Sequence, residues 1–142
     1  THLRMADTAI AVSSSSVDRT PLRYPGLVGF AASATKSLVE AATRLSREVS
    51  DRVFVGSIVT SGLFYDPDPE TFGRWRRLGH LGVEMEAAML YTIGATKGVE
   101  TLAMMTVSDV IAPDSEPIRI SDDELKRGVD QMMRIACRVA VG

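Results

Sequence analysis

The chain has 142 residues, of which 45% are hydrophobic and 24% charged, an ordinary size and composition for one soluble domain. Its formal net charge of −2 gives no electrostatic reason to expect nucleic acid or an anionic membrane as a partner. The single cysteine, Cys137, excludes an internal disulfide, and we expect it in the core because it lies in an apolar run. No apolar run reaches the ~18 residues of a membrane span, so we expect a cytoplasmic protein.

The first third of the chain predicts one strand and one helix. Residues 8–12 form a short β-type run, and the serines at residues 13–16 predict a polar loop. Residues 18–29 contain prolines and glycines and predict a second loop. Ser33 can cap a helix that runs to about Val49, because apolar residues recur there at helical spacing.

The middle of the chain alternates strands and helices. Residues 52–60 are rich in β-branched side chains and predict a buried strand. A short helix is expected at about residues 70–78, followed by a strand at residues 80–84. Residues 86–97 then predict a helix that Gly98 ends.

The last third adds a strand and a helix. Residues 102–107 form an apolar strand that ends on Ser108 and Asp109, and a loop with two prolines follows. Ser121 and Glu124 have the spacing of a capping box that opens the final helix. Alternating strands and helices indicate an α/β sandwich around a mixed or parallel sheet.

Glu84 and Glu86 flank Met85 where a strand gives way to a helix. Their side chains share a side if the backbone is extended there. Paired carboxylates accept hydrogen bonds from vicinal hydroxyls, such as the 2′ and 3′ hydroxyls of a ribose. Alternatively, Glu86 is an acid favoured in the first turn of a helix and Glu84 is solvated. The two residues alone leave both interpretations open.

Asp109 and Phe64 are the other candidates for a site. A carboxyl group at the end of a buried strand is partly desolvated, which raises its pKa and suits a general acid that protonates a leaving base. Asp109 can equally cap the following turn. Phe64 can stack on a flat heterocycle or fill the core under the next turn. His2 and His80 lack metal-ligand spacing, and we predict no metal site.

Three segments, in this order and at this spacing, resemble the nucleoside phosphorylase family, especially the bacterial hexameric purine nucleoside phosphorylases: Leu63-Phe64-Tyr65, Leu81 to Ala88 (LGVEMEAA) and Thr106 to Asp109 (TVSD). The resemblance implies a three-layer α/β sandwich with a mixed central sheet flanked by helices, incomplete at its N-terminus. Residues 1–142 would form one domain, the C-terminal portion of a family member. The implied reaction converts a purine nucleoside and inorganic phosphate to free base and ribose 1-phosphate, without a cofactor, in a homo-oligomer built from dimers, up to a hexamer.

The resemblance also implies roles for individual residues. Glu86 would hold the ribose hydroxyls, Met85 would contact the sugar, and Glu84 would support the sugar site. Phe64 would stack near the base.

The proton donor of the implied reaction is Asp109, next to Ser108. It would give its proton to purine N7 as the glycosidic bond breaks. In the family a basic residue of the last helix assists this aspartate, and Arg127 and Lys126 compete for that role here.

The family's Gly-Asp-Pro phosphate loop, second phosphate-binding arginine and Gly-Ser-rich segment have no counterpart in the printed sequence and would precede Thr1. We therefore expect the chain alone to bind purine nucleoside weakly and to turn it over poorly. Two alternatives remain. One is a nucleosidase that uses water, acting on methylthioadenosine or adenosylhomocysteine, and the other is a non-catalytic nucleoside-binding or subunit-interaction module.

Overall fold

The computed structural model describes residues 3–17, 30–111 and 118–142. The helices and strands follow one another as β1 (Thr8–Ser16), α1 (Lys36–Arg47), β2 (Val53–Thr60), α2 (Thr71–Arg77), β3 (Val83–Glu84), α3 (Ala87–Lys97), β4 (Ala103–Thr106), β5 (Asp109–Val110), β6 (Ile118–Arg119) and α4 (Asp122–Val141). The loops predicted at residues 18–29 and around Pro113 and Pro117 lie outside the described residues.

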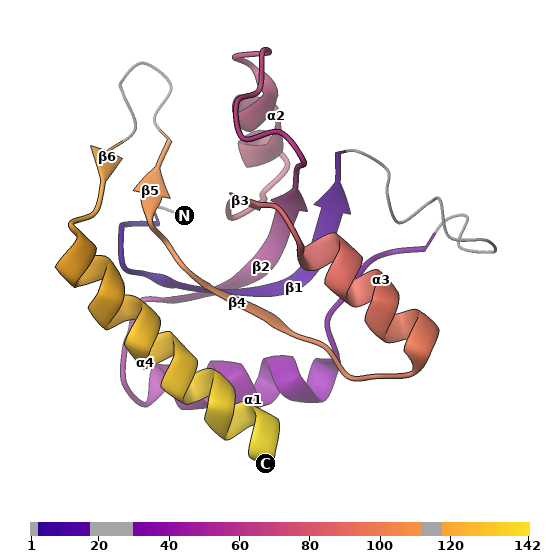
Figure 1. Cartoon of the computed structure of the whole chain (residues 1–142), viewed down its shortest axis with the longest axis vertical. Coiled ribbons are helices and arrows are strands. Elements are labelled where there is room, and N and C mark those ends of the chain that lie inside the picture. The colour runs from indigo at the N-terminus through magenta and orange to yellow at the C-terminus, as the bar shows by residue number, and fades with distance from the viewer. Residues whose placement is uncertain (1–2, 18–29, 112–117) are drawn as a thin grey trace.

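The central sheet is mixed, as the sequence predicts. Its strand order is β3-β2-β1-β4, with β1, β2 and β3 parallel and β4 antiparallel to β1. A separate antiparallel pair, β5 and β6, lies beyond the end of β4 (Figure 1). The register shifts between Ala11 and Ser13, so that Val12 has no partner on β2.

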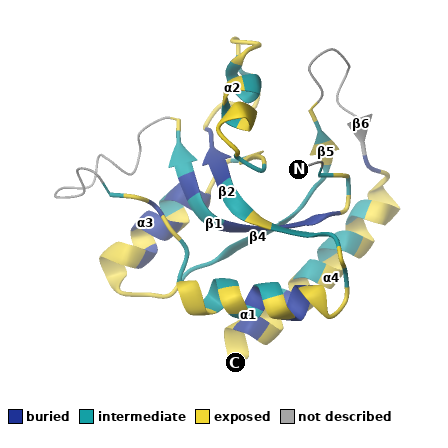
Figure 2. Cartoon of the chain, turned by 180° about the vertical axis from the view of Figure 1, so that it is seen from behind, coloured by how far each residue is buried: buried dark blue, intermediate teal, exposed yellow. Residues whose placement is uncertain are grey.

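Two hydrophobic cores lie on opposite faces of this sheet. Because successive strand residues point to opposite faces, Ile10 packs into one core and Ala11 into the other. The core around Ile10 is closed by α1 and α4, and the core around Ala11 is closed by α3. Buried residues accordingly line β1 and the inner sides of the helices (Figure 2). The three-layer α/β sandwich is therefore confirmed.

The buried Tyr91 of α3 joins the central strand β1 to the edge strand β4. Its hydroxyl donates to the carbonyl oxygen of Ala11 on β1 at 2.6 Å and accepts from the backbone N–H of Ala103 on β4 at 3.1 Å. Burial raises the pKa of the Tyr91 hydroxyl, although the hydrogen bond from Ala103 opposes this rise. One side chain thus fixes α3 against both strands.

The sequence predicts a loop for the serine run, and this prediction is wrong, because the serines form the second half of β1. Ser13 Oγ lies 2.8 Å from Ser57 Oγ on the neighbouring strand, and Ser14 Oγ lies 2.7 Å from Thr60 Oγ1. Hydroxyls that face one another across two strands satisfy their own hydrogen bonds, so this polar segment can be buried. Sequence polarity alone does not reveal such partners.

The helix boundaries agree with the sequence only in part. Ser33 does not cap α1, because its backbone forms a bridge with Ser13. Thr35 is the N-cap residue, and its hydroxyl accepts from the backbone N–H of Thr101 at 2.9 Å. Gly98 ends α3 in the left-handed conformation at φ 64°, as predicted, since glycine adopts this conformation at no steric cost.

Two further expectations are corrected. The strand predicted at residues 80–84 is reduced to Val83–Glu84, although Leu81 N–H still donates to Ser57 O at 2.8 Å. Cys137, expected in the core, is exposed, because α4 turns Ile135 and Val139 toward the sheet instead.

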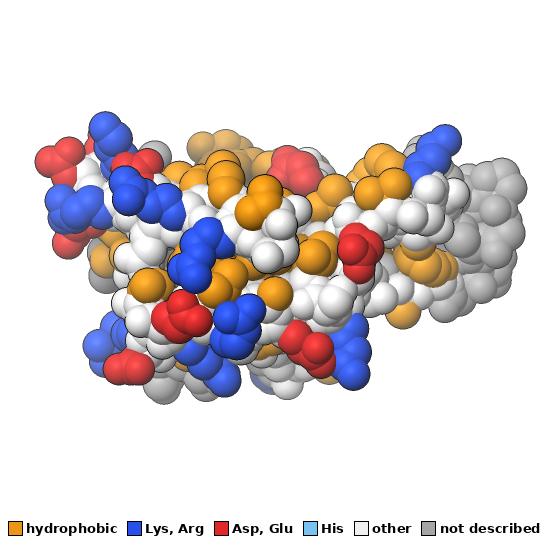
Figure 3. Space-filling view, turned by 90° about the horizontal axis from the view of Figure 1, so that it is seen from below, with side chains coloured by type: hydrophobic (Ala, Val, Ile, Leu, Met, Phe, Trp, Pro, Cys, Tyr) orange, Lys and Arg blue, Asp and Glu red, His pale blue; other side chains and the backbone are white. Residues whose placement is uncertain are grey.

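The outer face formed by α1 and α4 carries charged side chains of both signs, with hydrophobic side chains between them (Figure 3). Lys36 forms an ion pair with Glu40 at 3.6 Å, and Glu48 forms ion pairs with both Arg44 and Arg138 at 3.5 Å. In the described part of the chain, no helix is both long enough and apolar enough to cross a membrane.

Candidate active site

The carboxyl ends of β2 and β3 carry the first group of candidate residues. Thr60 pairs with Glu84 across these strands. The side chain of Glu84 is half-buried, and its Oε2 accepts from the backbone N–H of Glu86 at 2.8 Å and of Ala87 at 2.7 Å. The hydroxyl of Thr60 donates to the other carboxylate oxygen. Glu84 therefore caps the start of α3 and is only partly exposed to solvent.

Glu86 has the opposite environment. It occupies the N-cap position of α3 with φ −132° and ψ −27°, its side chain is exposed, and it makes no capping hydrogen bond. The neighbouring Met85 is 44% exposed. The two glutamates thus differ in environment, because Glu84 is hydrogen-bonded within the turn while the side chain of Glu86 is exposed beside Met85.

Phe64 lies on the loop that follows β2. Its side chain is 75% exposed and meets the ring of Tyr65 edge-on, with 5.0 Å between ring centroids. Phe64 is therefore not a core residue under the next turn. An exposed aromatic edge pair at a strand end can present a flat face to a heterocycle.

The second group of candidates lies beyond the carboxyl end of β4. Val107 donates its N–H to the carbonyl of Asp7 at 2.9 Å, and the chain then continues through Ser108 into β5. Ser108 Oγ donates to Asp109 Oδ2 at 2.6 Å. The expectation that burial would desolvate Asp109 is wrong for this chain, because β4 ends before it and its side chain is exposed.

Arg127 lies in the second turn of α4, close to the segment that carries Asp109. Gly128 packs on the end of β4, where an added Cβ would lie 2.8 Å from Thr106 Cγ2. Ile120, just before the helix, donates its N–H to Ser108 O at 3.2 Å. Within the described ranges, no ion pair joins Arg127 to Asp109.

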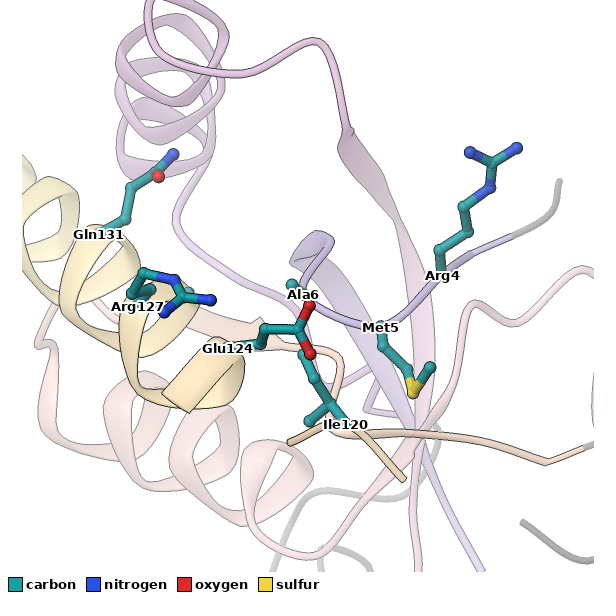
Figure 4. A pocket seen from close by; sticks show the side chains of 8 residues that line it. Arg4, Met5, Ala6, Ile120, Glu124, Arg127 and Gln131 are labelled. Carbon is teal, nitrogen blue, oxygen red and sulfur yellow. The ribbon is translucent and has the colours of Figure 1, made fainter. Parts of the chain in front are cut away.

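An open hollow of about 520 Å³ lies beside this helix turn. Figure 4 shows Arg127 and Glu124 extending from α4 toward the segment that carries Ala6, while Arg4 points away. The remaining lining residues are Met5, Ile120, Gly128 and Gln131. Lys126 is exposed on the same turn but does not line the hollow, so the geometry favours Arg127 over Lys126 as the basic residue near this segment.

The two groups of candidates lie at opposite ends of β1. Thr106 pairs with Thr8 at its start, whereas Thr60, opposite Glu84, pairs with Ser16 at its end. Eight residues separate these positions, which is about 26 Å along a straight strand at ~3.3 Å per residue. The sheet is curled, however, and β3 and β5 both lie on the upper side of the molecule in Figure 1.

Thr60 and Ser14 are the two residues at this site that sequence reasoning missed. Both are buried, and both belong to the hydrogen-bonded group around Glu84. Thr60 is the last residue of β2, in which Ser57 is the other polar side chain, and it lies four residues before Phe64. A hydroxyl at such a strand end is the signal that could have indicated it.

The mixed sheet, its two helical layers and the acidic side chains at its strand ends define an α/β protein with a nucleoside phosphorylase-like fold. The sequence model of the phosphorylase superfamily matches residues 3–140. The chain therefore belongs to the phosphorylase superfamily.

Its relatives include three bacterial proteins. The chain is 33% identical over 140 residues to purine nucleoside phosphorylase DeoD-type 2 of Vibrio cholerae, covering 98% of this chain and 58% of that protein. It is 37% identical over 130 residues to the DeoD-type enzyme of Clostridium novyi, covering 92% and 53%. It is 43% identical over 108 residues to that of Clostridium beijerinckii, covering 75% and 45%. The chain spans about half the length of the curated relatives it matches.

Proposed function

We propose that this chain provides the ribose- and base-binding side of a purine nucleoside phosphorylase. The observation that carries the proposal is the different environment of the two glutamates. Glu84 is used to hold the turn at the start of α3, which leaves the exposed carboxylate of Glu86 to accept hydrogen bonds from the 2′ and 3′ hydroxyls of a ribose. The names of the relatives supply the purine specificity of the proposal.

In the proposed reaction, phosphate attacks C1′ of the ribose while the bond from C1′ to purine N9 breaks. The bonding electrons pass into the base, and Asp109 donates a proton to N7, so that neutral base leaves and ribose 1-phosphate remains. Ser108, which donates a hydrogen bond to Asp109, fixes the orientation of that carboxyl group. Arg127 would then stabilise the carboxylate that proton transfer leaves behind.

The remaining site residues would orient the substrate. Phe64 would stack on the purine ring, and Met85 would pack against the sugar. Both side chains are exposed: Met85 directly precedes Glu86, and Phe64 lies on the loop that follows the adjacent strand β2. Inorganic phosphate would be the co-substrate, and no cofactor is required. We also propose a cytoplasmic homo-oligomer built from dimers, for which Leu90 and Ile93 on the outer side of α3 offer exposed apolar surface.

The test uses the protein as its coding sequence encodes it. Inosine and adenosine are supplied with and without phosphate, and free base is measured by chromatography. The proposal predicts base and ribose 1-phosphate only with phosphate. Base release with water alone would identify a nucleosidase, and nucleoside binding that ignores phosphate without base release would identify a binding module.

Glu86→Gln, with Glu40→Gln as its matched control, tests the sugar site. Loss of a charged acceptor for two hydroxyls should raise KM for inosine on the order of tenfold or more. Glu40 lies on the exposed side of α1, where the same substitution should leave KM unchanged. Equal behaviour of the two variants would remove Glu86 from the site.

A further inference from the structure

We propose that Thr60 and Ser14 are positioning residues that hold Glu86 in place for ribose binding, acting through Glu84. This inference rests on the proposed function. Neither residue contacts Glu86 directly, and both lie behind the turn that presents it. Their side chains join the ends of three strands to the start of α3.

The polar group is buried and closely spaced. Ser14 is 7% exposed and Thr60 is 5% exposed. Ser14 Oγ lies 2.7 Å from Thr60 Oγ1, which also accepts from the backbone N–H of Ala88 at 2.9 Å and bonds to Glu84 Oε1. The second oxygen of Glu84 accepts from the N–H groups of Glu86 and Ala87.

The direction of each hydrogen bond follows from the number of protons. An ionised carboxylate only accepts, so the single hydroxyl proton of Thr60 must go to Glu84. Thr60 Oγ1 therefore accepts from Ser14, whose hydroxyl must be the donor of that pair. The hydroxyl of Thr60 then uses its one donor and both acceptor positions, and no other side chain of similar size except serine can replace it.

The backbone of the turn depends on this arrangement. The carboxylate of Glu84 holds the N–H groups of the two residues that begin α3, and one of these residues is Glu86 itself. Valine at position 60 has the shape of threonine but neither donates nor accepts. It would leave one oxygen of Glu84 and the N–H of Ala88 without their partner, and the turn that carries Glu86 would relax.

The ligand test compares inosine with 2′,3′-dideoxyinosine in Thr60→Val and Thr60→Ser variants of the protein as its coding sequence encodes it. Only inosine has the hydroxyls that Glu86 would bind. Thr60→Val should raise Kd for inosine on the order of tenfold and change Kd for dideoxyinosine little, and Thr60→Ser should restore discrimination. Equal weakening for both nucleosides would indicate general structural damage and would overturn the inference.

A second measurement, without nucleoside, separates this inference from the proposed function. Amide hydrogen exchange of Glu86, Ala87 and Ala88 should become on the order of tenfold faster in Thr60→Val and stay near the parent rate in Thr60→Ser. Unchanged exchange in folded Thr60→Val overturns the inference. If the parent protein binds no nucleoside, the proposed function fails, and with it the role toward ribose, whatever exchange shows. If Thr60→Val does not fold, Ser14→Ala replaces it, with the same pattern expected at smaller amplitude and the same outcomes overturning the inference.

Discussion

Replacing Tyr91 with phenylalanine tests how α3 is joined to the sheet. The substitution keeps the ring and removes one hydroxyl from a side chain that is 0% exposed. It leaves the carbonyl of Ala11 and the N–H of Ala103 without their partner. Each unpaired group costs about 1–3 kcal/mol, so the free energy of unfolding should fall by about 2–6 kcal/mol.

Urea denaturation followed by circular dichroism measures this difference. The matched control is Tyr65→Phe, because Tyr65 is 86% exposed and its hydroxyl lies in solvent. The control should stay within about 0.5 kcal/mol of the parent. A Tyr91→Phe variant that is as stable as the control would refute the role assigned to this hydroxyl.

The stability difference between the parent and Tyr91→Phe should depend on pH, and the pKa of Tyr91 gives the sign of this dependence. Burial holds the pKa of Tyr91 in the folded state above its unfolded value of about 10, so the unfolded state loses its proton first as pH rises. The stabilisation by Tyr91 is complete below about pH 10 and is lost as pH rises through the folded pKa. The stability difference between the parent and Tyr91→Phe should therefore shrink above about pH 10. A difference that grows there would contradict the raised pKa.

Two further predictions concern packing and proton transfer. In α3, Gly94→Ala would place its Cβ 2.5 Å from Thr101 Cγ2, and overpacking should cost about 1–3 kcal/mol in calorimetric unfolding. As the control, Gly73→Ala on α2 meets no atom closer than 3.5 Å and should be neutral or stabilise by up to about 1 kcal/mol. Equal melting temperatures of the two variants would contradict the close approach of Gly94 to Thr101. Asp109→Asn should lower kcat for inosine by about 10²–10⁴ while sparing 7-methylinosine, whose N7 needs no proton. Equal losses on both substrates would exclude Asp109 as the acid.

Local sequence signals predicted the elements whose causes are local. The β-branched run of β2, the glycine at position 98 and the N-cap Ser121 of α4 all appear where expected. Ser121 Oγ accepts from the N–H of Glu124 at 3.4 Å, whereas the Glu124 carboxylate accepts from the Ser121 hydroxyl rather than from its backbone N–H. The serines of β1 were misread because their partners, Ser57 and Thr60, lie more than forty residues away. Long-range pairing of this kind is absent from any local pattern.

The candidate site was predicted in its residues more than in its geometry. Spacing and resemblance indicated Glu84 and Glu86 together, but only the structure shows that one carboxylate caps a helix while the other is exposed. Asp109 is not buried as expected, because β4 ends before it and β5 pairs with β6 instead of a strand of the central sheet. Strand ends and burial depend on which strands meet, and sequence periodicity does not specify this.

The central claim is that Glu86 binds the ribose hydroxyls while Glu84 holds the turn. A crystal structure of the complex with inosine tests it most directly. The account predicts both hydroxyl oxygens, O2′ and O3′, within about 2.5–3.2 Å of the carboxylate of Glu86, with Glu84 still bonded to the N–H groups of Glu86 and Ala87. A sugar bound by Glu84, or bound away from both glutamates, would contradict it.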